Sequence, residues 1–129
     1  MDFSLVCKAH AVSATFFGLV FLVASFGWSL PIIGPEALLA GWDMDNAAFA
    51  YLIRFTSGVM FGFGMMEWVF AEQEKMKDIF VIYHAISAVL LLYSSMAAAT
   101  YWLGWLYAVL ITAFGVAGMI AKPSGYSRV

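Results

Sequence analysis

The chain has 129 residues, of which 64% are hydrophobic and 11% are charged, and its formal net charge is −2. Soluble domains have about 45–50% apolar and ~25% charged residues, and a small soluble domain cannot bury this much apolar surface, so the composition indicates a membrane protein. The chain has no run of basic residues of the kind that would indicate a nucleic-acid partner. The single cysteine, Cys7, excludes an internal disulfide and a multi-cysteine metal site, and we expect it to be an inert, buried thiol.

Four apolar stretches are expected to cross the membrane as helices, because each approaches the ~20 residues that span about 30 Å of hydrocarbon. In chain order they cover residues 5–30, 47–71, 79–99 and 105–121. No convincing cleavage site follows the first stretch, so we expect a retained span rather than a signal peptide. The pattern predicts an all-α fold, with residues 1–129 forming a single transmembrane domain built as a four-helix bundle.

The connections between these stretches carry turn, breaker and capping signals. Residues 31–46 contain proline, glycine and acidic residues and are predicted to form an extramembrane loop. Asp45 or Asn46 is expected to cap the second span at its N-terminus. The charged segment 72–78 is predicted to be the next loop, with Asp78 capping the third span.

The basic residues predict the orientation of the protein. Four spans place one arginine, Arg54, on one side of the membrane and five basic residues on the other. Because basic residues collect on the cytoplasmic side, both termini are expected there. The five are Lys8, Lys75, Lys77, Lys122 and Arg128.

The second span, 47–71, is expected to be the most buried helix. Arg54 near its outer end is predicted to clamp the preceding loop by pairing with a carboxylate, or to bind an anionic group such as a lipid headgroup. Gly58 and Gly62 permit close approach of another helix, with internal packing favoured over a dimer face. Their expected partner surface contains Gly115 and Gly118.

Three ionisable residues are expected at one depth. His10, Glu67 and His84 all fall within roughly 5–10 Å of the cytoplasmic boundary, at 1.5 Å of rise per residue. They are predicted to form a polar cluster if their faces point inward, since ionisable groups within spans are costly and often functional. The cluster can be structural or relay protons, and His10 or His84 can be the axial ligand of haem or a chlorophyll-type pigment. Helix rotation is not known from spacing, so no metal site is predicted.

One stretch of the second span carries a resemblance. The sequence LIRFTSGVMFGFGMMEW, followed by a charged turn and a span with an early histidine, resembles small four-span bacterial membrane proteins, including the DoxX-like group. The similar part covers roughly residues 50–120. This resemblance implies a four-helix fold and transfers no activity or catalytic residue.

Three functions remain open. The first is a non-catalytic membrane subunit that packs against a larger membrane complex or binds lipid, with other membrane subunits or a second copy as partners. The absence of a reaction motif favours this function over an enzyme. The second is an accessory subunit of a photosynthetic or electron-transfer complex that binds a cofactor or a pigment such as chlorophyll or carotenoid, which an aromatic content of 18% can accommodate. The third is a small proton-coupled transporter that works as a dimer through Glu67 and His84.

Overall fold

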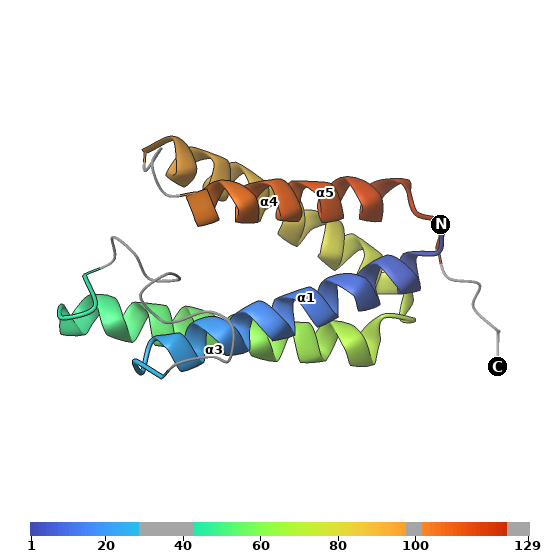
Figure 1. Ribbon diagram of the computed structural model, residues 1–129. Coiled ribbons are helices and arrows are strands. Elements are labelled where there is room, and N and C mark those ends of the chain that lie inside the picture. The colour runs from blue at the N-terminus through green and yellow to red at the C-terminus, as the bar shows by residue number, and fades with distance from the viewer. Residues whose placement is uncertain (29–42, 98–101, 124–129) are drawn as a thin grey trace. The chain divides into compact units, whose positions relative to one another are not determined.

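The computed structural model describes residues 1–28, 43–97 and 102–123 (Figure 1). These residues confirm the all-α fold, with α1 (Phe3–Ala24), α3 (Ala47–Phe70), α4 (Glu74–Ala97) and α5 (Trp102–Ile120). The first three helices are long and apolar enough to cross a membrane, whereas the apolar stretch of α5 is shorter. The chain therefore has the features of a helical membrane protein, and a fourth span stays a prediction.

The helices form two compact units. The first contains residues 1–10 and 67–129, and the second contains residues 11–66. The helices α4 and α5 belong wholly to the first unit, whereas α1 and α3 contribute residues to both.

In the second unit, α1 and α3 lie close together because two glycines remove side chains from the contact (Figure 1). A Cβ atom added at Gly18 would lie 2.6 Å from the backbone nitrogen of Phe61. A Cβ atom at Gly64 would lie 2.7 Å from the backbone nitrogen of Thr15. Both distances are shorter than any real contact of a Cβ atom, so only glycine permits this backbone approach.

The two glycines predicted for packing have a different environment. Gly58 and Gly62 are exposed, and a Cβ atom at either position would meet no described atom within 4 Å. The contact stripe of α3 runs through Ser57, Phe61 and Gly64 instead. One residue turns a helix by about 100°, so Gly58 and Gly62 point away from this stripe. Within the second unit no described residue packs against Gly58 or Gly62, and their internal packing stays a prediction.

The first helix ends earlier than the predicted span, which extended to residue 30. Gly27 has a φ of +75°, a backbone conformation that glycine adopts without a steric penalty. Its amide donates to the carbonyl of Ala24 at 2.9 Å, and the amide of Trp28 donates to the carbonyl of Val23 at 3.4 Å. This pair of hydrogen bonds is a Schellman motif, which satisfies the last carbonyls and stops α1.

The starts of α3 and α4 test the predicted caps. The side-chain oxygen of Asn46 accepts hydrogen bonds from the amides of Ala48 at 3.1 Å and Phe49 at 3.2 Å, which confirms Asn46 as an N-cap. By contrast, α4 begins at Glu74, so Asp78 lies inside the helix and is not its cap. Most of the predicted 72–78 loop is the first turn of α4.

In the first unit, α4 packs along α5 (Figure 1). A Cβ atom at Gly115 would lie 3.0 Å from the Cβ of His84, and one at Gly118 would lie 2.8 Å from the ring of Phe80. The two α5 glycines therefore form a packing surface, and it faces α4. A core cluster lies at one end of the unit and consists of Phe3, Val6, Cys7, Ala71, Met76, Phe80 and Ala121.

Hydrogen bonds join the start of α1 to the end of α5 within this unit. The amide of Phe3 donates to the carbonyl of Lys122 at 2.9 Å, and the amide of Lys122 donates to the carbonyl of Met1 at 3.0 Å. The Lys77 ammonium donates to the carbonyl of Ala121 at 2.5 Å. The N-terminus, the start of α4 and the end of α5 therefore meet at one end of the unit.

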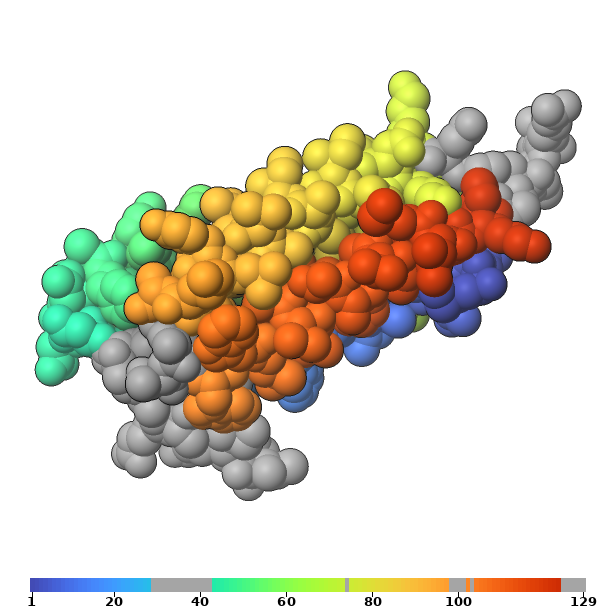
Figure 2. Space-filling model, turned by 90° about the horizontal axis from the view of Figure 1, so that it is seen from above, coloured from blue at the N-terminus to red at the C-terminus, as the bar shows by residue number. Residues whose placement is uncertain are grey.

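The outward faces of α4 and α5 are apolar, and both helices run along the face shown in Figure 2. Their exposed side chains include Ile86, Val89, Leu90, Val109, Val116 and Ile120.

The expectation that the second span is the most buried is wrong. In α1, 44% of the apolar stretch is buried, against 17% in α3 and in α4.

Candidate functional site

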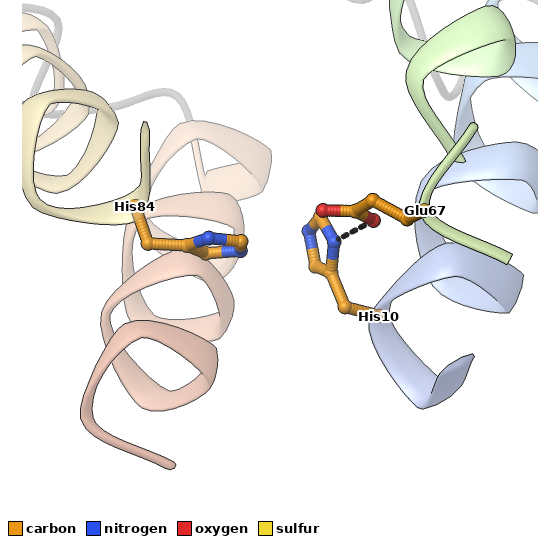
Figure 3. A group of neighbouring side chains, drawn as sticks. All are labelled: His10, Glu67 and His84. Carbon is orange, nitrogen blue, oxygen red and sulfur yellow. Dashed lines mark hydrogen bonds and ion pairs between the residues drawn. The ribbon is translucent and has the colours of Figure 1, made fainter. Parts of the chain in front are cut away.

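The first unit brings His10, Glu67 and His84 together. They project from α1, α3 and α4, and Figure 3 shows the ring of His84 directed towards His10 and Glu67. One ligand atom from each residue lies within 4.8 Å of the other two. The three side chains are buried, and Glu67 and His84 have no exposed surface. This is the polar cluster that the depth argument predicted, and we call it the His–Glu–His cluster.

A short hydrogen bond joins two members of the cluster. The Nδ1 atom of His10 lies 2.6 Å from Oε2 of Glu67, slightly shorter than the ~2.7–2.9 Å usual for charge-assisted N–H···O hydrogen bonds. The contact links the N-terminal part of α1 to the C-terminal part of α3. It satisfies one oxygen of the carboxyl group and one nitrogen of the ring.

The third member is oriented by the backbone of its own helix. The Nδ1 atom of His84 lies 2.7 Å from the carbonyl oxygen of Phe80, one turn earlier in α4. A carbonyl oxygen can only accept, so Nδ1 must carry the hydrogen. In the neutral ring, Nε2 then presents its lone pair towards the cluster.

Two polar atoms of the cluster have no partner among the described residues. They are Oε1 of Glu67 and Nε2 of His84, and both are buried. Leaving a buried polar group unsatisfied costs about 1–3 kcal/mol, more if the group is charged, so such atoms are rare without a ligand or water. Nε2 of His84 is an acceptor in this tautomer, and Oε1 is an acceptor when Glu67 is ionised, so a donor or a cation complements the pair.

Aromatic rings enclose the two histidines. The ring of Phe80 stacks on His84 with 3.9 Å between centroids, and Phe114 packs edge-on against His10 at 4.9 Å. The two imidazole centroids are themselves 4.3 Å apart. The two imidazole rings therefore lie among aromatic side chains within the first unit.

Cys7 lies one turn before His10 on α1. Its Sγ atom is fully buried and lies 3.6 Å from the backbone carbonyl of Glu67, to which the thiol donates. The contact helps to hold the end of α3 against α1 within this unit. Its burial agrees with the expectation of an inert thiol, because reactive cysteines are partly exposed.

Arg54 belongs to the second unit. Its guanidinium donates to the carbonyl of Ser25 at 3.0 Å and lies 4.5 Å from the ring centroid of Phe26. A cation at this position complements the negative end of the α1 dipole. Among the described residues Arg54 forms no ion pair with Asp43 or Asp45. Its hydrogen bond instead connects it to the end of α1. The third predicted partner, Glu36, lies outside the described residues.

Sequence reasoning missed several contacts around the cluster. The ammonium of Lys8 pairs with the carboxylate of Glu72 at 2.8 Å, near the N-terminus of α1. Their opposite charges near two adjacent span ends were an available signal. The roles of Phe80 and Phe114 as walls had no such signal, because phenylalanine is common throughout the chain.

Comparisons with known proteins return no match. No family model, no curated protein and no solved structure matches this chain. The resemblance to DoxX-like proteins therefore stays a prediction, and the site rests on its own geometry.

Proposed function

We propose that the chain is a four-span integral membrane protein, with both termini in the cytoplasm, that acts as a non-catalytic binding subunit. Its His–Glu–His cluster would hold a small cation near the cytoplasmic boundary. The observation that carries this proposal is the pair of unpartnered buried acceptors, Glu67 Oε1 and His84 Nε2. Buried ionisable groups within membrane spans are functional candidates because their desolvation is costly.

The contacts at one end of the first unit support the orientation. The start of α1 is hydrogen-bonded to Lys122 beyond α5, as expected if both ends lie on one side of the membrane. Lys8 and Lys77 lie at the same end, through contacts with Glu72 and Ala121. Basic residues on one side agree with a cytoplasmic location. In this arrangement α5 is the fourth span, with Trp102 and Trp105 at the opposite interface.

The exposed surface supports contact with lipid or another membrane subunit. The outward side chains of α4 and α5 are apolar, as lipid requires. On α3, open space above Gly58 and Gly62 would admit a close helix from another subunit or a second copy.

Single cysteines test the topology. The protein is prepared with Cys7→Ser, and Asp45→Cys or Glu72→Cys is added separately. In intact cells, a membrane-impermeant maleimide should label the cysteine at 45, whereas the one at 72 should react only after the membrane is opened. Labelling of position 72 in intact cells would overturn the orientation.

Native mass spectrometry of gently extracted protein tests the binding role. We expect a small bound species in the wild type that is lost in Glu67→Gln, which keeps the shape of the side chain and removes its charge. Glu72→Gln is the matched control, because this exposed carboxylate pairs with Lys8 outside the cluster. The proposal would be contradicted if the wild type carried no bound species and the Glu67→Gln variant gave the same native mass spectrum and assembly state as the wild type.

The same experiment separates the alternatives. A bound chlorophyll, carotenoid or haem would favour the pigment-binding subunit. A protein without bound species, in which Glu67→Gln abolishes solute-driven proton movement in vesicles, would be a proton-coupled transporter. Co-purification of large subunits would identify the complex to which the chain belongs.

A further inference from the structure

We propose that His10, Glu67 and His84 form a mononuclear site for a divalent first-row transition metal ion. This inference rests on the proposed function and names the class of cation that the cluster would bind. One candidate ligand atom from each residue lies within 4.8 Å of the other two.

The ligand set selects the class of metal. Two imidazole nitrogens and one carboxylate oxygen suit zinc, iron, cobalt, nickel or copper. Calcium and magnesium prefer all-oxygen sites and bind imidazole poorly. Zinc sites with two histidines and one glutamate are typically sites that keep a fourth position open for water or another ligand.

The surroundings of His84 match those of a metal ligand. Histidines that bind metals usually donate their other ring N–H to a carbonyl or carboxylate, which orients the ring and selects its tautomer. His84 makes this contact with the carbonyl of Phe80 at 2.7 Å, and its free Nε2 is directed into the cluster. Gly115 lies close to the Cβ of His84, which limits the space into which this residue can move.

Metal binding requires a small contraction of the cluster. Zinc–nitrogen and zinc–oxygen bonds are ~2.0–2.2 Å, so the ligand atoms of one zinc ion lie roughly 3.3 Å apart in a tetrahedral site. The candidate ligand atoms lie up to 4.8 Å apart, so the most distant two must move closer together. The hydrogen bond of 2.6 Å between His10 and Glu67 must also rearrange if its two atoms become ligands. Changes of side-chain rotamer supply such movements.

A histidine-specific measurement tests the site without any substitution. The chain has two histidines, so a signal from two coordinated imidazoles can come only from His10 and His84. Protein purified without a histidine tag is loaded with one equivalent of Cu²⁺, and pulsed electron paramagnetic resonance counts the bound imidazoles. Two imidazoles on one ion are expected; none, or one, would overturn the proposal.

Zinc binding and substitution give the second test. Equilibrium dialysis should show one Zn²⁺ per chain, with affinity lowered by about 100-fold or more in Glu67→Gln and His84→Gln, because loss of a ligand costs at least as much as loss of an outer hydrogen bond. Glu72→Gln is the matched control and should bind as the wild type does. Circular dichroism without metal verifies that each variant is folded.

The outcomes separate this inference from the proposed function. If Zn²⁺ and Cu²⁺ do not bind the cluster but native mass spectrometry finds another species that Glu67→Gln removes, the metal site is wrong and the binding role stands. If metal binds with unchanged affinity in both cluster variants, the site lies elsewhere and the inference fails. If no species of any kind occupies the cluster, both fail.

Discussion

His10 and Glu67 are separated by 57 positions in the chain, yet their side chains meet at 2.6 Å in a fully enclosed contact. The pair joins α1 to α3 within the first unit and leaves the second oxygen of Glu67 facing His84. A buried pair of this kind is expensive to break on one side only, because the remaining group stays desolvated.

A double-mutant cycle measures this pair. His10→Leu and Glu67→Leu should each lower the free energy of unfolding, whereas the double variant should lose less than the sum. We expect a coupling of about 1–2 kcal/mol, typical of strong hydrogen bonds between membrane helices. Unfolding in mixed detergent and dodecyl sulfate micelles provides the measurement, and strictly additive effects would show that the contact contributes nothing.

Gly115→Ala tests the positioning of His84. The added Cβ atom would lie 3.0 Å from the Cβ of His84, so the α4 side chain must shift away from its place in the cluster. Zinc affinity should fall by about 10-fold, as for other losses of ligand orientation. Gly58→Ala is the control, because its Cβ atom meets nothing within 4 Å. Equal zinc affinity in both variants would contradict a positioning role for Gly115.

Zinc binding should weaken as the pH falls. Protons compete with the metal for the two imidazoles and the carboxylate, so affinity drops by roughly 10-fold per pH unit for each proton that binding must displace. Equilibrium dialysis between pH 8 and pH 5.5 checks the sign and the slope. An affinity that does not change over this range would indicate ligands other than histidine.

Substitutions of glycine in the second unit distinguish the two faces of α3. Gly18→Ala should destabilise the protein by about 1–3 kcal/mol, since the new Cβ atom would lie 2.6 Å from the backbone nitrogen of Phe61 and the helices must separate. Gly62→Ala should be neutral or stabilise by up to ~1 kcal/mol through helix propensity, because the space above it is open. The same unfolding measurement applies, and the reverse order would show that α1 packs on the other face.

Arg54→Met should destabilise the end of α1. The variant loses the hydrogen bond to the carbonyl of Ser25 and the contact with the ring of Phe26, together worth about 1 kcal/mol. Arg54→Lys should recover part of this loss, because it keeps the charge near the helix end without the planar guanidinium. Hydrogen exchange of the amides at residues 23–28 reports the local effect, and no change in either variant would exclude the clamp.

The sequence alone determined the class of the protein. Apolar stretches of span length predicted the helices, since a membrane helix is a local property of composition and length. The N-cap at Asn46 also follows from local chemistry. The depth argument placed His10, Glu67 and His84 at one level because rise per residue is constant in a helix.

Tertiary structure decided which faces meet. The contact of α1 with α3 uses Gly18 and Gly64, and Gly58 and Gly62 remain open. Rotating a helix by one residue, about 100°, changes which of its residues face the neighbouring helix. A helix that is apolar on all sides carries no strong sequence signal for this rotation. The unpartnered atoms of Glu67 and His84 likewise depend on how the helices of the first unit pack. Spacing along the chain sets the depth of a side chain, but only the packed helices determine its neighbours.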